Sequence, residues 1–331
     1  KDADKVQIYT THPTPPYVMM LAANAGEGTI KIKTPEFVVM LVLRSFFGWK
    51  REVKGESESV CPHCGMNQMR LFLIESGCIA PPEVLWNWGL LCDVNNKTGG
   101  VLQKNYPDII GMDITQLKGH FTGQERFQYL SMQIKQKFHM EISESAERKA
   151  WDQWISLILT MESITELNNK MQGQLLGGND LALFHSILLT AFSDWIPVIE
   201  VVKLLFIELK DRKKQMKYSE KNCLYCYYVP LTTPEVSTIF AGYGINLIGN
   251  TAFLSYRAER YPQQSLSDKI ASMCMQILIG NDHTAEAQEV CKRLKEYRCR
   301  GYLTGMFSND RWIGGNQKDI ARLIEKESGY P

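Results

Sequence analysis

Long apolar runs are missing from this 331-residue sequence. The best candidate, residues 37–49, is interrupted by Arg44, whereas a helix that crosses a bilayer needs about 20 apolar residues. We therefore predict no transmembrane segment. Low-complexity tracts and internal repeats are also missing, which argues against disorder over most of the length and against a repeat architecture.

Catalytic signatures are missing as well. The sequence has no Gly-x-x-x-x-Gly-Lys-Ser/Thr phosphate loop, no Gly-x-Ser-x-Gly elbow and no His-Glu-x-x-His metal motif. Its six histidines are scattered, so no pair of nucleophile and base can be identified. His185 lies on an apolar segment and is expected to be a buried core residue. We expect that the protein is not an enzyme.

An excess of charge is absent too, because 37 Lys and Arg residues stand against 36 Asp and Glu residues, a net charge of +1. This balance argues against nucleic-acid binding through overall charge but leaves local basic patches open. Nine cysteines at irregular spacings in a chain of this size favour a reducing, intracellular compartment. Because the chain starts at Lys1 and not at Met, we expect a fragment or a processed product.

Helical patterns dominate what is present. Tryptophan and aliphatic residues recur at spacings of three and four over residues 145–171, which predicts an amphipathic helix. Residues 29–33 alternate between apolar and polar side chains and predict a short strand. Pro81-Pro82-Glu83 is expected to begin a helix that continues through Val84, Leu85, Trp86 and Trp88, and residues 95–100 are expected to be a loop. Further helices are expected over residues 180–195, 197–221, 284–297 and 321–327.

The glycine-containing segment 173–179 predicts a break between two lobes. The fold class we predict is mainly α, a two-lobed helical protein with a few short strands and a zinc-knuckle-type turn in the N-terminal lobe. The expected domains are an extended arm with a short strand (1–34), an N-terminal helical lobe with the knuckle (35–172) and a C-terminal helical lobe with basic clusters (180–331).

The most specific motif is Cys61-Pro62-His63-Cys64-Gly65. In a zinc knuckle, two thiolates at this spacing bind the metal, and a glycine after the second relieves crowding. Zinc is the cofactor that this motif predicts, with Cys61 and Cys64 as ligands and Cys78 and Cys92 as the nearest candidates to complete the site.

Two other interpretations of the motif stay open. Cys-Pro-His-Cys resembles the active-site motif of thioredoxin-fold oxidants, which implies a thiol-disulfide oxidoreductase with Cys61 as nucleophile, Cys64 as resolving thiol and His63 as the residue that tunes their reactivity. That family has a buried strand before the motif, whereas residues 55–59 are polar. The remaining interpretation is a pair of free thiols near a surface turn.

Three clusters that contain basic residues lie in the C-terminal half. Residues 203–221 contain seven cations and three carboxylates, and residues 291–301 contain five cations and one carboxylate, a balance of +4 in each segment. Between them, residues 256–261 alternate arginines with tyrosines that can stack on bases. Solvated helix ends, favoured by the helix dipole, would give the same clusters without any ligand.

A helix-rich chain of this size with these clusters resembles the nucleoproteins of negative-strand RNA viruses. Residues 239–262 are similar to a stretch in the C-terminal lobe of bornavirus-like and pneumovirus-like nucleoproteins. The resemblance implies non-specific encapsidation of single-stranded RNA, self-assembly through the terminal arm, and location in the host cytoplasm or nucleus and in the virion. The RNA-binding residues it implies are Lys213, Lys214, Lys217, Arg257, Arg260, Lys292, Arg293, Arg298 and Arg300.

The main rival is a zinc-braced structural or protein-interaction module, such as a capsid, matrix or adaptor component. In that case the basic clusters are ordinary surface.

Overall fold

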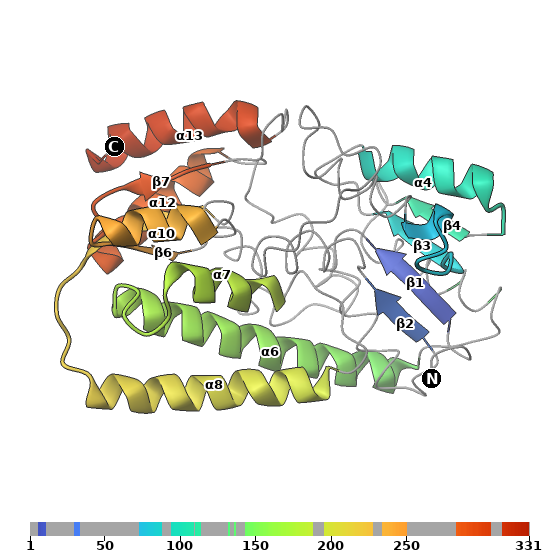
Figure 1. Ribbon diagram of the computed structural model, residues 1–331, viewed down its shortest axis with the longest axis horizontal. Coiled ribbons are helices and arrows are strands. Elements are labelled where there is room, and N and C mark those ends of the chain that lie inside the picture. Colours follow the sequence, from blue (N-terminus) through green and yellow to red (C-terminus); the bar gives the residue numbers. More distant parts are fainter. Residues whose placement is uncertain are drawn as a thin grey trace.

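The computed structural model of the chain is mainly helical, as the sequence predicts, and it also contains two parallel β-sheets (Figure 1). The structure describes residues 6–10, 30–33, 73–87, 94–108, 110–113, 132, 136, 143–187, 195–227, 234–249, 283–305 and 313–330. No helix within these ranges combines the length and apolar character needed to cross a membrane.

The first sheet has four parallel strands, drawn in blue and cyan in Figure 1. They are β1 (Val6–Thr10), β2 (Ile30–Lys33), β3 (Val84–Asn87) and β4 (Ile110–Asp113), in the order β2-β1-β3-β4. The strand predicted at residues 29–33 is confirmed as β2. Because β1 pairs with both β2 and β3, residues 6–10 of the predicted arm are an inner strand of the chain's own sheet.

The helix predicted after Pro82 is wrong, because this segment forms strand β3. Val84 and Leu85 are fully buried. An apolar run of this length fits a buried strand as well as a helix, so periodicity could not decide between the two.

The loop predicted at residues 95–100 is also wrong, because these residues lie inside helix α4 (Val94–Asn105). Its asparagines and glycines have poor helix propensity. The chain must nevertheless cross over between the parallel strands β3 and β4, and a helix is the usual crossover. Leu102 of α4 packs with Leu85 and Ile74 in the local core.

The second sheet has three parallel strands, β5 (Asn222–Cys226), β6 (Ile245–Gly249) and β7 (Tyr302–Leu303), in the order β6-β5-β7. Helix α10 (Pro234–Gly242) lies between β5 and β6 in the chain, and α12 (His283–Tyr297) precedes β7. Helix α13 (Ile313–Ser328) packs on α12. The core that these elements share includes Tyr225, Ile248, Val290, Leu294, Ile320 and Ile324.

Three further helices are α6 (Glu144–Lys170), α7 (Gly178–Ser186) and α8 (Ile196–Gln215). Helices α6 and α7 contact β6 of this sheet. The long helix predicted over residues 145–171 is confirmed as α6. The Ser143 hydroxyl caps it by accepting a hydrogen bond of 3.2 Å from the Ala146 amide. Helix α8 packs along α6 on the side away from α7 (Figure 1). It ends at Gln215, short of the predicted end at residue 221.

The helix break predicted at residues 173–179 is confirmed in part, because α6 ends at Lys170 and α7 begins at Gly178, whereas the boundary between two lobes stays a prediction. Gly173 has a φ of +72°, and a Cβ there would lie 3.0 Å from the Ile248 side chain. The end of α6 is therefore close against β6. The Asn246 side chain donates a hydrogen bond of 2.8 Å to the Gln172 carbonyl, and the Gly249 amide donates one of 3.1 Å to the Asn169 side chain.

Candidate nucleic-acid interface

Two of the predicted basic clusters meet at the end of the three-stranded sheet where strands β5 and β7 begin. Lys217 and Lys221 lie in the connection from α8 into β5, and Arg298 and Arg300 lie in the turn from α12 into β7. The Arg300 amide donates a hydrogen bond of 2.8 Å to the Cys223 carbonyl of β5. All four basic side chains are exposed. We call Lys217, Lys221, Arg298 and Arg300 the basic edge.

The buried side chain of Gln172 joins these two segments. Gln172 follows α6 and has a left-handed backbone conformation, with a φ of 50°. Its Oε1 accepts hydrogen bonds from the Lys221 amide (2.8 Å) and from the Tyr218 hydroxyl (3.0 Å). Its Nε2 donates to the Tyr297 carbonyl (3.2 Å) at the end of α12. One amide group therefore holds together two basic segments that are far apart in the sequence.

The basic edge keeps a net positive charge. Residues 217–221 and 298–300 contain four cations and one carboxylate, that of Glu220. The four cations form no ion pair with any residue in the described ranges, and the same holds for the exposed Lys213 in the last turn of α8. Lys214 differs, because it binds the Asp211 carboxylate at 2.7 Å. This hydrogen bond and the charge of Lys214 lower the pKa of Asp211.

An exposed aromatic ring lies within the basic edge. Tyr218 is 44% exposed, and its hydroxyl is fixed by the hydrogen bond to Gln172. An aromatic ring among cations is the arrangement that single-strand binding proteins use to stack bases while they neutralise phosphates. The sequence prediction missed Tyr218. Its signal was the position of the ring directly after Lys217 and three residues before Lys221.

Arg293 does not belong to this surface, although the sequence predicted it as an RNA ligand. Its side chain is only 5% exposed and forms ion pairs with Glu289 (2.9 Å) and Glu296 (2.8 Å) on the same helix. Burial by itself would lower the pKa of Arg293, but Tyr297, Tyr225 and Glu296 outweigh it and raise the pKa above its ordinary value. Arg293 is thus a buried, ion-paired residue of α12, and its guanidinium is not exposed for binding an RNA phosphate.

The other predicted ligands are placed as follows. Lys292 is exposed on α12, next to the buried Arg293. Arg257 and Arg260 lie outside the described residues. Of the four predicted zinc ligands, Cys78 is exposed with a free thiol, and Cys61, Cys64 and Cys92 lie outside the described residues. Within the described part of the chain, no group of three or more His, Cys, Asp or Glu side chains is arranged to hold a metal ion.

The second Cys-x-x-Cys pair, Cys223 and Cys226, is buried in β5. The Cys223 sulfur lies 3.6 Å from that of Cys299, which follows α12. The hydrogen bond with Cys299 lowers the pKa of Cys223, and the charge of Arg300 acts in the same direction. Burial raises the pKa of Cys226, which keeps that thiol protonated. These side chains fill the core next to the basic edge.

The chain matches no model of a known protein family, and a search of curated proteins finds no significant match to it.

Proposed function

We propose that this protein binds single-stranded RNA through the sugar-phosphate backbone, without sequence specificity, and coats it as a structural nucleoprotein. The observation that supports this most is the basic edge, where cations from two distant segments are exposed together and lack carboxylate partners in the described part of the chain. The proposal depends on this edge, and the two-lobed arrangement stays a prediction.

We expect phosphate binding because these cations form no ion pair within the described part of the chain. A lysine or arginine already paired with a carboxylate must give up that partner before it binds a phosphate, whereas Lys217, Lys221 and Arg300 have none to give up within the described part. Each phosphate contact releases a condensed counterion from the RNA, so affinity falls with added salt. Contacts of this kind hold the backbone and carry no sequence information.

Tyr218 adds a second type of contact. Its ring is exposed and its hydroxyl is tied to Gln172, so the ring is held in place before RNA binds. Stacking of a base on such a ring is sequence-tolerant because every base has a π face. It also favours single strands, whose bases are available, over duplexes, whose bases are already stacked.

The test is RNA affinity measured by fluorescence anisotropy with a single-stranded RNA at several salt concentrations. The slope of log affinity against log salt should become shallower by about 2 in the triple variant Lys217→Glu, Lys221→Glu, Arg300→Glu, at about 0.7 per phosphate contact. The matched control is the triple variant Lys104→Glu, Lys318→Glu, Lys326→Glu, which reverses three exposed lysines on α4 and α13. An unchanged slope in the basic-edge variant, or equal losses in both variants, would contradict the proposal.

A zinc ion on Cys61 and Cys64 stays a separate prediction and would brace the N-terminal part of the chain. Metal analysis of the purified protein measures it directly. A zinc content of one per chain with no RNA affinity would favour the rival, a zinc-braced structural module.

A further inference from the structure

Two buried cysteines lie against each other next to the basic edge. Cys223 belongs to β5 and is fully buried, and Cys299 lies two residues after the end of α12 and is 2% exposed. Their sulfur atoms are 3.6 Å apart, although the two residues are separated by 76 positions in the sequence. Both thiols are free. The sulfurs of a disulfide are about 2.05 Å apart, so this pair has to approach by only about 1.5 Å to form a bond.

The backbone holds Cys299 against β5. Arg298 has a left-handed conformation, with a φ of 55°, and the Cys299 amide donates a hydrogen bond of 2.9 Å to the Leu294 carbonyl. These are features of a Schellman motif, which ends a helix and reverses the chain. The next amide, that of Arg300, donates a hydrogen bond of 2.8 Å to the Cys223 carbonyl. Hydrogen bonds on both sides therefore fix the position of Cys299 relative to Cys223.

The described cysteines offer no other pairing as close as this one. The sequence spacing would favour a bond between Cys223 and Cys226, but residues three positions apart on a strand point to opposite faces of the sheet. The Cys291 sulfur lies 3.8 Å from a backbone carbonyl of α13. The fold, and not the sequence spacing, thus selects Cys299 as the partner of Cys223.

The two thiols differ in acidity. The hydrogen bond with Cys299 lowers the pKa of Cys223 and outweighs the opposing effect of burial, and the charge of Arg300 lowers it further. The hydrogen bond with Cys223 raises the pKa of Cys299, and burial acts in the same direction. The thiolate is the reactive form of cysteine. Cys223 is therefore the thiol that reacts first, and Cys299 stays protonated beside it.

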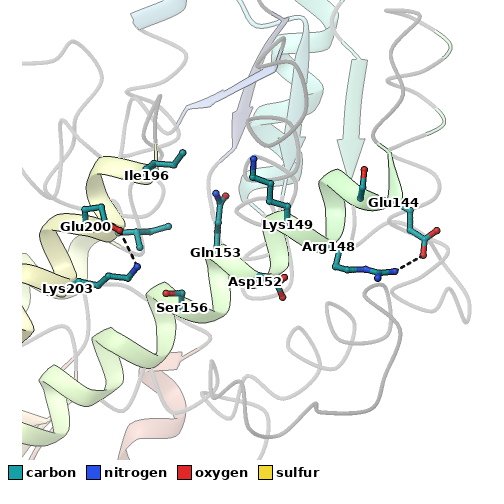
Figure 2. Close-up of a pocket in the computed structure, with 11 residues that line it drawn as sticks. Glu144, Arg148, Lys149, Asp152, Gln153, Ser156, Ile196, Glu200 and Lys203 are labelled. Atoms are coloured by element: carbon teal, nitrogen blue, oxygen red, sulfur yellow. Dashed lines mark hydrogen bonds and ion pairs between the residues drawn. The ribbon is translucent and has the colours of Figure 1, made fainter.

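An oxidant reaches these sulfurs through the turn after α12. Cys299 lies between the exposed residues Arg298 and Arg300, so a local opening of this turn uncovers it. The groove between the first halves of α6 and α8 does not lead to the pair, because neither cysteine is among the residues that line it (Figure 2). We therefore expect the reaction to need a local opening of the turn and not unfolding of the sheet.

We infer that Cys223 and Cys299 form a reversible disulfide when the protein meets a peroxide. The Cys223 thiolate attacks one oxygen of hydrogen peroxide and becomes a sulfenic acid, while hydroxide leaves and is protonated to water. The Cys299 sulfur then attacks the sulfenic sulfur, so that the S–S bond forms, the S–O bond breaks and a second water leaves with the Cys299 proton. Two thiols and one peroxide thus give one disulfide and two waters, and a dithiol reverses the reaction.

The bond would join the two segments that carry the basic edge. Lys221 lies two residues before Cys223, and Arg298 and Arg300 flank Cys299. A cross-link between residues so far apart in the sequence restricts the unfolded chain strongly, so it should stabilise this end of the sheet. The inference goes beyond the proposed function and does not depend on it, because the reaction needs the two sulfurs and no RNA.

The test is peptide mapping by mass spectrometry of the folded chain after hydrogen peroxide, with remaining thiols blocked by N-ethylmaleimide before digestion. Trypsin should release residues 222–257 linked to the dipeptide Cys299-Arg300. Dithiothreitol should remove the link, and Cys223→Ala and Cys299→Ala should lack it. The matched control is Cys226→Ala, because residues 222–257 also contain this buried cysteine, and the link should persist in it.

Two further measurements keep the test decisive if a variant folds poorly. Fragmentation of the linked peptide from the unchanged chain shows directly whether Cys223 or Cys226 holds the bond. Urea unfolding without reductant should give a higher midpoint for the oxidised chain than for the reduced chain, and this difference should be lost in Cys299→Ala.

Folded protein that yields no link between residues 223 and 299 would overturn the inference, and so would a bond from Cys299 to Cys226. A midpoint that does not rise on oxidation would overturn the stabilising effect. RNA affinity is measured separately, so loss of the disulfide and loss of the proposed function are distinct results.

Discussion

Helices α8 and α12 both lead into the three-stranded sheet, and both segments have a charge balance of +4 in the sequence, yet they use their cations differently. Near the end of α8, Lys213 and Lys217 are exposed and have no ion pair in the described part of the chain. In α12, the central Arg293 is buried between two carboxylates. Equal counts of charge therefore do not mean equal binding surfaces.

The difference follows from what each helix packs against. Helix α12 lies between the sheet and α13, and seven of its residues are buried, so a long side chain at position 293 has no solvent to reach. A buried cation must be paired to remain charged at low cost. Helix α8 packs on α6 along one side, and Lys213 and Lys214 of its last turn are exposed. The environment of each cation, and not the local charge count, decides whether it can bind RNA.

The largest expected effect is on the free energy of unfolding, when Arg293 of α12 is replaced. Arg293→Ala removes both ion pairs and the hydrogen bond to the Tyr297 hydroxyl (3.2 Å), and it leaves a cavity. We expect the free energy of unfolding to fall by about 3 kcal/mol or more. The neighbouring exposed cation is the control, because Lys292→Ala should change it by less than about 0.5 kcal/mol. Urea unfolding measures both, and similar values for the two variants would remove the contrast between buried and exposed cations.

His185 extends the comparison to a buried ionisable group that is kept neutral. Its Nε2 lies 2.8 Å from the Thr165 hydroxyl, and burial lowers its pKa to about 3. The unfolded chain takes up this proton near pH 6.5, whereas the folded chain does not. The contribution to stability is therefore complete above about pH 6.5 and is lost as the pH falls toward 3.

This effect should amount to about 2 kcal/mol between pH 6.5 and pH 5, at about 1.4 kcal/mol per pH unit. The variant His185→Gln lacks the titrating group, so its free energy of unfolding should depend less on pH over this interval by that amount. Urea unfolding at a series of pH values measures the difference. Parallel curves for the two proteins would mean that His185 takes up its proton at the same pH in the folded and the unfolded chain.

A smaller effect, on the affinity for RNA, is expected when Tyr218 in the basic edge is replaced. Tyr218→Leu should lower the affinity for single-stranded RNA about tenfold, because one stacked base contributes about 1–3 kcal/mol. The salt slope should not change, since no cation is lost. Tyr218→Phe is the matched control, because it keeps the ring and loses only the hydrogen bond to Gln172. Equal affinity losses in the two variants would assign the effect to that hydrogen bond and not to stacking.

The smallest effect is expected at the ion pair of α8. Asp211→Asn frees Lys214, and both side chains are more than half exposed. The free energy of unfolding should change by less than about 0.5 kcal/mol, as is usual for surface ion pairs. If Lys214 can then contact RNA, the salt slope should steepen by about 0.7. A loss of stability well above that limit would show that α8 also depends on its charges for folding.

Local patterns were enough to predict α6, α8, α12 and the strand β2, but not α4 or the pairing of strands in the two sheets. Apolar residues recur at spacings of three and four along the 27 residues of α6, and Ser143 caps its N-terminus. Periodicity and capping therefore both predict this helix. Strands β3 and β5 have four and five residues, and their partners are distant in the sequence, so no local signal distinguishes them from other short apolar runs. A parallel sheet needs long connections, which local periodicity does not reveal.

The same division holds for the candidate site. The basic clusters could be identified from the sequence, but their meeting depends on hydrogen bonds of Gln172, a residue with no distinctive sequence signal. The burial of Arg293 had a signal that could have been used. Glu289 and Glu296 lie four residues before and three residues after it, the spacings at which side chains on a helix pair.

The strand order β6-β5-β7 has a consequence for how the protein is made. β5 is the central strand, yet it is the first of the three to leave the ribosome, and its partners β6 and β7 come later in the chain. Until residues 302–303 have been synthesised, one edge of β5 has no partner, and unpaired edges are where chains aggregate. Folding of this region should therefore be slow and should wait until β7 has been synthesised, and chains that end before β7 should be captured by chaperones or degraded.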